Sequence, residues 1–143
     1  MPAIERGMQK GGRAPGDVDV ICEAIVCAGR TEEELAAATR GVKGLLSFYG
    51  STPSYKPVLD VEGWGDLQPA LNRLSKQGEW ATMATLIDDD VLRTIGVVGS
   101  PEECGREIVE RFSGIASRVC CYFPGYEIPP ADLAALVDTV RAA

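Results

Sequence analysis

Val-Asp-Val-Ile-Cys-Glu-Ala-Ile-Val-Cys-Ala, residues 18–28, is the stretch that predicts the fold of this chain. It is an almost continuous apolar run rich in β-branched residues, which is typical of a strand covered on both faces in a parallel sheet. Glu23 interrupts the run, and two interpretations of it stay open. Either its carboxylate reaches solvent at an edge or end of the sheet, or it is a functional group that points into a cavity.

A helix is predicted directly after this strand. Thr31 and Glu34 have the spacing of a capping box, and apolar residues then recur at helical intervals as far as Tyr49. Gly41 and Gly44 lie inside this pattern, where each glycine costs about 1 kcal/mol relative to alanine. We therefore expect close packing on a sheet to offset that cost.

Two further strand-and-helix units follow, with strands expected at 94–98 and 118–123. The second strand leads into a helix with Ser100 as N-cap, Pro101 at the first helical position and a capping box closed by Glu103. Shorter helical patterns cover residues 2–10, about 67–76 and the stretch from 79 onward, and 88–90 reads as a helix cap rather than a metal site. Strands alternating with helices predict an α/β fold with a parallel sheet, a single domain over residues 1–143.

The segment 50–66 is predicted to be an irregular loop rich in aromatic residues, and such a loop is more often a lid or binding loop than a plain connector. Tyr55 and Trp64 are therefore the candidates for stacking on a ring or a substrate. Gly99 and Ser100 are the candidates for cofactor binding, because free N–H groups at a helix start attract phosphate. The alternative at that helix start is pure capping, since Glu102 and Glu103 already complement the helix dipole.

Composition excludes several classes of function. The 143 residues carry a net charge of −7 and no basic stripe, which disfavours nucleic acid and anionic membranes as partners. The chain has no histidine, so catalytic triads and imidazole bases are excluded. Five cysteines without metal-ligand spacing indicate buried, reduced thiols in a cytoplasmic protein, and no metal site is expected.

Several stretches resemble the C-terminal region of luciferase-like flavin oxidoreductases. The most specific is Phe-Tyr-Gly-Ser-Thr-Pro-Ser-Tyr-Lys-Pro-Val-Leu, residues 48–59, followed by Gly-Trp-Gly-Asp-Leu, residues 63–67. Similar stretches occur at 74–78, 86–89 and 97–103, and the resemblance extends from Pro2 to about Tyr122. It is closest to the actinobacterial branch that depends on the deazaflavin coenzyme F-420.

The resemblance implies three parallel βα units that correspond to the C-terminal part of a TIM (β/α)₈ barrel, hence an incomplete barrel. It implies an oxidoreductase that uses F-420 or FMN for hydride transfer or monooxygenation. The family's catalytic residues have no counterpart here, so no catalytic residue is assigned and the chain alone is expected to be inactive. The alternative is a non-catalytic remnant that self-associates, or a subunit of a split enzyme.

Two kinds of partner follow from an incomplete barrel: a second copy of this chain or a complementary N-terminal chain. Open strand edges and an exposed inner face would need cover. Ile21, Ile25, Val97 and Val119 are the residues expected near such an interface. The active site would lie at the C-terminal ends of the strands, and the aromatic loop would have to fold over that mouth to act as a lid.

Overall fold

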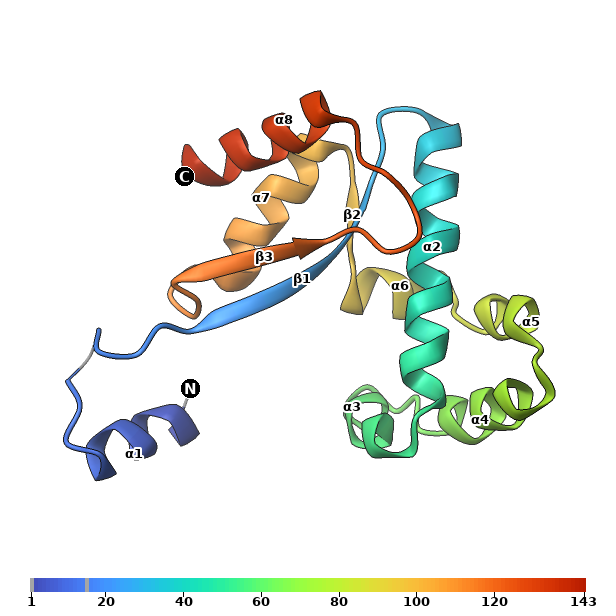
Figure 1. Ribbon diagram of the computed structural model, residues 1–143, viewed down its shortest axis with the longest axis horizontal. Coiled ribbons are helices and arrows are strands. Elements are labelled where there is room, and N and C mark those ends of the chain that lie inside the picture. Colours follow the sequence, from blue (N-terminus) through green and yellow to red (C-terminus); the bar gives the residue numbers. More distant parts are fainter. Residues whose placement is uncertain (1, 15) are drawn as a thin grey trace.

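A computed structural model describes residues 2–14 and 16–143 as a small parallel sheet with helices around it (Figure 1). The strands are β1 (Ile21–Ala28), β2 (Val97–Gly99) and β3 (Arg118–Tyr122). The helices, in chain order, are α1 (Pro2–Lys10), α2 (Glu32–Ser51), the 3₁₀ helix η1 (Pro53–Tyr55), α3 (Lys56–Val61), α4 (Leu67–Gln77), α5 (Trp80–Thr85), α6 (Asp89–Ile95), α7 (Pro101–Phe112) and α8 (Pro130–Arg141).

All three predicted strands exist and pair in parallel, each followed by a helix, as predicted. The strands are shorter than expected: β1 begins at Ile21 rather than at residue 18, and β2 begins at Val97. Residues 94 and 95 belong instead to α6, which the sequence interpretation missed. Asp88 does cap that helix, since its carboxylate accepts a hydrogen bond from the Val91 amide.

The order of the sheet is β2-β1-β3, so the first strand lies in the centre. Val26 pairs with Val97 on one side, and Glu23 pairs with Cys120 on the other. In a (β/α)₈ barrel, strands that follow one another in the chain are neighbours and the helices form one outer ring. This sheet therefore does not have the order of three consecutive barrel strands, which corrects that part of the fold prediction.

Helices cover both faces of the sheet. Cys27 packs into a cluster with α2, whereas Ala24 and Val26, on the opposite face, pack with α7 and α8. Crossovers are right-handed, so connections that run in opposite directions along a sheet place their helices on opposite faces. The strand order thus explains why α2 and α7 lie on different sides (Figure 1).

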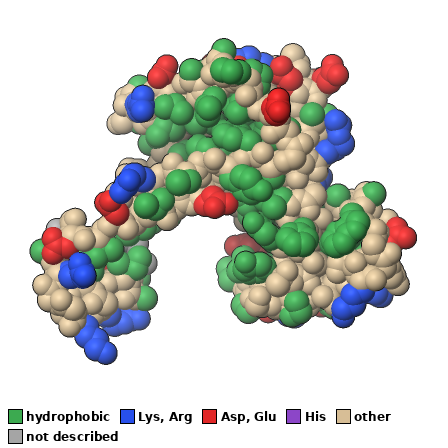
Figure 2. All heavy atoms as spheres, in the orientation of Figure 1, with side chains coloured by type: hydrophobic (Ala, Val, Ile, Leu, Met, Phe, Trp, Pro, Cys, Tyr) green, Lys and Arg blue, Asp and Glu red, His purple; other side chains and the backbone are tan. Residues whose placement is uncertain are grey.

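On the sheet face that carries Ile21 and Glu23, α2 covers only the end near Cys27. Ile21 remains 54% exposed and Tyr122 39% exposed on this open face, and the molecule is hollowed below the sheet, between α1 and the helices α3 to α5 (Figure 2). Glu23 reaches solvent here, as one interpretation held, although it lies on the central strand rather than at an edge.

The segment 50–66 is not irregular, contrary to the prediction. Residues 53–61 form η1 and α3, and each of these begins with a proline in its first turn. Pro favours a first helical turn because its fixed φ suits the helix and its missing N–H is not needed there. The ion pair between Lys56 and Asp60 adds an i,i+4 contact along α3. The prolines and glycines of the segment are the residues that favoured a loop in the sequence.

Candidate functional site

The C-terminal ends of β1 and β2 form the edge where a βα fold carries its functional groups. Parallel strands bring the starts of α2 and α7 to this same edge, and the Gly29 amide donates to the Gly99 carbonyl at 3.1 Å. Gly99 and Ser100 therefore lie where they were predicted to lie, at the end of a strand and the start of a helix.

The helix start at Ser100 is occupied by the chain's own carboxylate. The Ser100 amide and hydroxyl both donate to Oε2 of Glu103 at 2.8 Å. Gly99 allows this close return, because a Cβ at that position would meet the Glu103 side chain at about 3 Å. These bonds hold the pKa of Glu103 below its usual range. A phosphate at this helix start would first have to displace Glu103.

The start of α2 is filled in the same way. The carboxylate of Glu34 accepts hydrogen bonds from the backbone amides of Arg30 at 2.8 Å and Thr31 at 3.0 Å, and these bonds lower its pKa. Both capping boxes predicted from the sequence are confirmed. The two helix starts at the ends of β1 and β2 therefore already hold a carboxylate each.

Arg30 is the cationic side chain that lies between these helix starts. It forms ion pairs with Glu102 on α7 at 2.7 Å and with Asp132 on α8. The bonds to Glu102 and Asp132 raise the pKa of Arg30, and the bond from Arg30 lowers the pKa of Glu102. Sequence reasoning missed this cluster, because its members are 72 and 102 residues apart along the chain.

Tyr126 forms hydrogen bonds with the C-terminal part of β1, beyond the residues that pair with β3. Its hydroxyl accepts a hydrogen bond from the Ala28 amide and donates one to the Val26 carbonyl, both at 2.9 Å. Its ring stands edge-on to Phe123, with centroids 6.0 Å apart. Burial raises the pKa of this phenol. Tyr126 thus continues the pairing along β1 beyond the last residue of β3.

The aromatic candidates lie far from this edge. α2 has 20 residues and is therefore about 30 Å long, and the segment with Tyr55 and Trp64 follows its far end (Figure 1). Tyr55 lines an apolar cavity, whereas Trp64 packs against the core cluster under α2. The structure does not bring Tyr55 or Trp64 together with Gly99 and Ser100, and the aromatic segment is no lid over the strand ends.

The residues at the strand ends do not fit a cofactor phosphate as they stand. The Arg30 guanidinium is already paired with the carboxylates of Glu102 and Asp132. The carboxylates of Glu34 and Glu103 hold the backbone amides of the two helix starts. An added dianion would meet like charge and helix starts without a free amide at Ser100 or Thr31. Within residues 2–14 and 16–143, no group of three or more histidine, cysteine or acidic side chains could hold a metal ion.

The cysteines form no disulfide in the described parts of the chain. Cys27 and Cys104 are buried, and burial raises the pKa of the Cys104 thiol to about 12. Cys120 is exposed on the open sheet face, contrary to the prediction that all five are buried. No helix in the described ranges is both long and apolar enough to cross a membrane.

The sequence model of the luciferase-like monooxygenase family matches residues 1–118. This chain belongs to that family. The match ends where β3 begins, so β1 and β2, which are neighbours in the sheet, lie within it. β3, the strand that departs from barrel order, and α8 lie beyond the match.

Relatives of this luciferase-like chain occur in mycobacteria. It is 43% identical over 123 residues to the uncharacterized proteins Mb1395 of Mycobacterium bovis and Rv1360 and MT1405 of Mycobacterium tuberculosis. The alignment covers 86% of this chain but 36% of the length of each relative. Luciferase-like proteins commonly bind flavin-type cofactors, and that property belongs to the family as a whole.

Proposed function

We propose that this chain is one portion of a luciferase-like oxidoreductase and is not catalytic on its own. The reaction of the whole protein would be F-420- or FMN-dependent hydride transfer or monooxygenation in the cytoplasm. The observation that carries the proposal is the family match over residues 1–118, in a chain whose alignment covers about a third of the length of its relatives. The filled helix starts at Thr31 and Ser100 support it, because the cofactor phosphate would be held by other segments.

Cofactor titration tests this proposal. With its anion seats occupied by Glu34 and Glu103, the isolated chain should bind FMN or F-420 only in the high-micromolar range or more weakly, which is less than about 7 kcal/mol. Calorimetry and the fluorescence of Trp64 and Trp80 report binding independently. Submicromolar binding of either cofactor by the chain alone would contradict the proposal.

A variant asks whether Gly99 and Ser100 keep a latent phosphate site. Glu103→Ala frees the Ser100 amide and removes one negative charge, so it should raise the affinity for either cofactor if the phosphate binds there. Glu110→Ala, an exposed change on the same helix, removes the same charge elsewhere and is the matched control. If the two variants change the cofactor affinity equally, Gly99 and Ser100 do not bind the cofactor phosphate.

We also propose, as a second role, that the open sheet face binds another chain, either a second copy or a complementary N-terminal chain. Exposed Ile21 and Tyr122 support this. Val97 and Val119 were predicted to share the interface, but they pack on the other face with α7 and α8. The physical reason is the strand order, which places helices on both faces.

Light scattering at micromolar concentration measures this role directly. An oligomer that dissociates in Ile21→Asp is the expected result for self-association. Val18→Asp, a change at another exposed apolar residue just before the strand, serves as the control. A wild-type chain that stays monomeric at this concentration would rule out self-association through the open face.

A further inference from the structure

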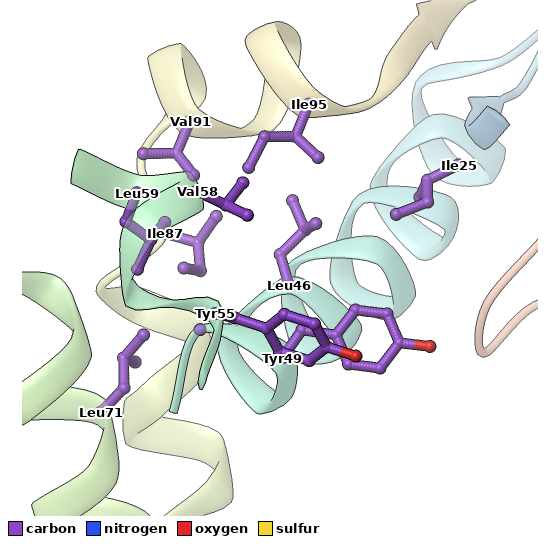
Figure 3. A pocket seen from close by; sticks show the side chains of 11 residues that line it. Ile25, Leu46, Tyr49, Tyr55, Val58, Leu59, Leu71, Ile87, Val91 and Ile95 are labelled. Carbon is purple, nitrogen blue, oxygen red and sulfur yellow. The ribbon is translucent and has the colours of Figure 1, made fainter. Parts of the chain in front are cut away.

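An apolar cavity of about 300 Å³ lies at the far end of α2 from the strand ends (Figure 3). Five parts of the chain enclose it: β1, the last turns of α2, the segment of η1 and α3, α4, and the region of α6 with the loop before it. Its floor is formed by Leu71, Ile87 and Val91, which are buried. Its mouth is formed by Tyr55 and Val58, which are 47% and 59% exposed.

The cavity opens to solvent at its mouth, so it is a surface pocket that a ligand can enter directly. Small-molecule sites begin at roughly 300 Å³ and are mostly apolar. The cavity is about twice the size of an engineered apolar cavity of about 150 Å³ that accepts benzene. It therefore has room for a ligand of about two aromatic rings.

The lining sets the chemical class of the occupant. Apart from the two phenols of Tyr49 and Tyr55, no titratable side chain faces the cavity. A charged ligand would lose its hydration without gaining a partner. The Tyr49 and Tyr55 rings lie 5.7 Å apart, tilted by 55°, beside the mouth. Within the described residues neither hydroxyl is hydrogen-bonded to another residue, so each is free to bond one polar atom of a ligand.

We propose that this cavity is a binding site for an uncharged aromatic molecule of about two rings. The site is distinct from the helix start considered above for a cofactor phosphate, because neither Gly99 nor Ser100 lines it. Aliphatic side chains contact the ligand's faces, and the tyrosine rings flank its outer edge.

Two matched probes and two matched variants test this site. N-phenylnaphthylamine is uncharged and fluoresces in apolar surroundings, and anilinonaphthalene sulfonate has the same ring skeleton with a negative charge. The wild-type chain should bind the neutral probe at one site per chain, and bind the sulfonate at least about tenfold more weakly. Val58→Trp places a large side chain in the mouth and should weaken the neutral probe by about tenfold or more.

Val61→Trp is the control, because Val61 lies on the same helix, is 78% exposed and does not line the cavity. Both positions are exposed, so both variants should fold, which circular dichroism checks. The proposal is overturned if the wild-type chain binds no neutral probe, if the sulfonate binds as tightly, or if the two variants lose affinity equally. Probe binding that vanishes on dilution, as an oligomer dissociates, would place the probe between copies and overturn it too.

Discussion

Gly41 and Gly44 are one helical turn apart in α2, yet their surroundings are opposite. A Cβ at Gly41 would overlap the carbonyl oxygen of Pro124, in the loop after β3, whereas a Cβ at Gly44 would meet nothing within 4 Å. The predicted close packing is therefore real at Gly41 alone, and its partner is a loop rather than the sheet. Sequence cannot separate these two glycines, because the contact joins segments more than 80 residues apart.

The two glycines should respond to alanine with opposite signs. Gly44→Ala should stabilise the chain by up to about 1 kcal/mol, the helix propensity gain at an open position. Gly41→Ala should destabilise it by about 1–3 kcal/mol, because α2 and the Pro124 loop must move apart. Urea denaturation of both variants measures the difference, and a gain in stability at Gly41 would show that the loop is not held against α2.

A second residue-scale prediction concerns Glu34 and acid. Its pKa in the folded chain lies below the ordinary value of 4.5, because the amides of Arg30 and Thr31 donate to its carboxylate. A carboxyl with a depressed folded pKa contributes stability above its unfolded pKa, and this contribution is lost as the pH falls through the folded pKa. Unfolding free energy should therefore decline on acidification below about pH 4.5.

Glu34→Gln isolates this contribution, because glutamine keeps an oxygen acceptor but does not titrate. The variant should lose less stability than wild type between about pH 5 and pH 3. Glu33→Gln, an exposed change in the same turn, is the matched control. Denaturant titrations across this pH range provide the measurement, and equal slopes for all three proteins would contradict the assignment.

At the scale of elements, features that depend on residues close together in the sequence could be predicted. Features that depend on contacts between distant residues could not. The two capping boxes and the three strands were each predicted from residues that are close together in the sequence. α3 was missed because the prolines and glycines of its segment favoured a loop, and α6 was missed because residues 94 and 95 were assigned to the following strand. Tyr126 was missed because its role depends on where β3 ends relative to β1, which no local pattern encodes.

Tyr126→Phe should loosen the C-terminal half of β1. The change keeps the ring against Phe123 but leaves the Ala28 amide and Val26 carbonyl without their hydroxyl partner. Loss of such a bond to buried groups costs about 1–3 kcal/mol. The Ala28 amide should exchange its hydrogen faster, and Tyr122→Phe, on the open face, is the matched control. Unchanged exchange at Ala28 would mean that the hydroxyl does not complete the strand edge.

For the whole molecule, the sequence predicted that the strands form a parallel sheet, but it did not predict their order in that sheet. The alternation of strands and helices gave a parallel sheet, and the resemblance implied barrel order. The structure instead pairs β1 with β3 at five positions, from Ile21 with Arg118 to Ile25 with Tyr122. Both orders bury similar apolar strands, so the sequence pattern alone does not choose between them.

Crosslinking distinguishes the two orders. Glu23 lies directly opposite Cys120, and both side chains are exposed on the open face. Neighbouring parallel strands are about 4.8 Å apart, so Glu23→Cys should be joined to Cys120 by a short bis-maleimide, detected as a linked peptide pair by mass spectrometry. Glu33→Cys, exposed at the start of α2, should give no such link.

In barrel order β2 would lie between β1 and β3, which roughly doubles the separation. A Glu23→Cys variant that is modified at both thiols without being linked within one chain would favour barrel order and overturn the central position of β1.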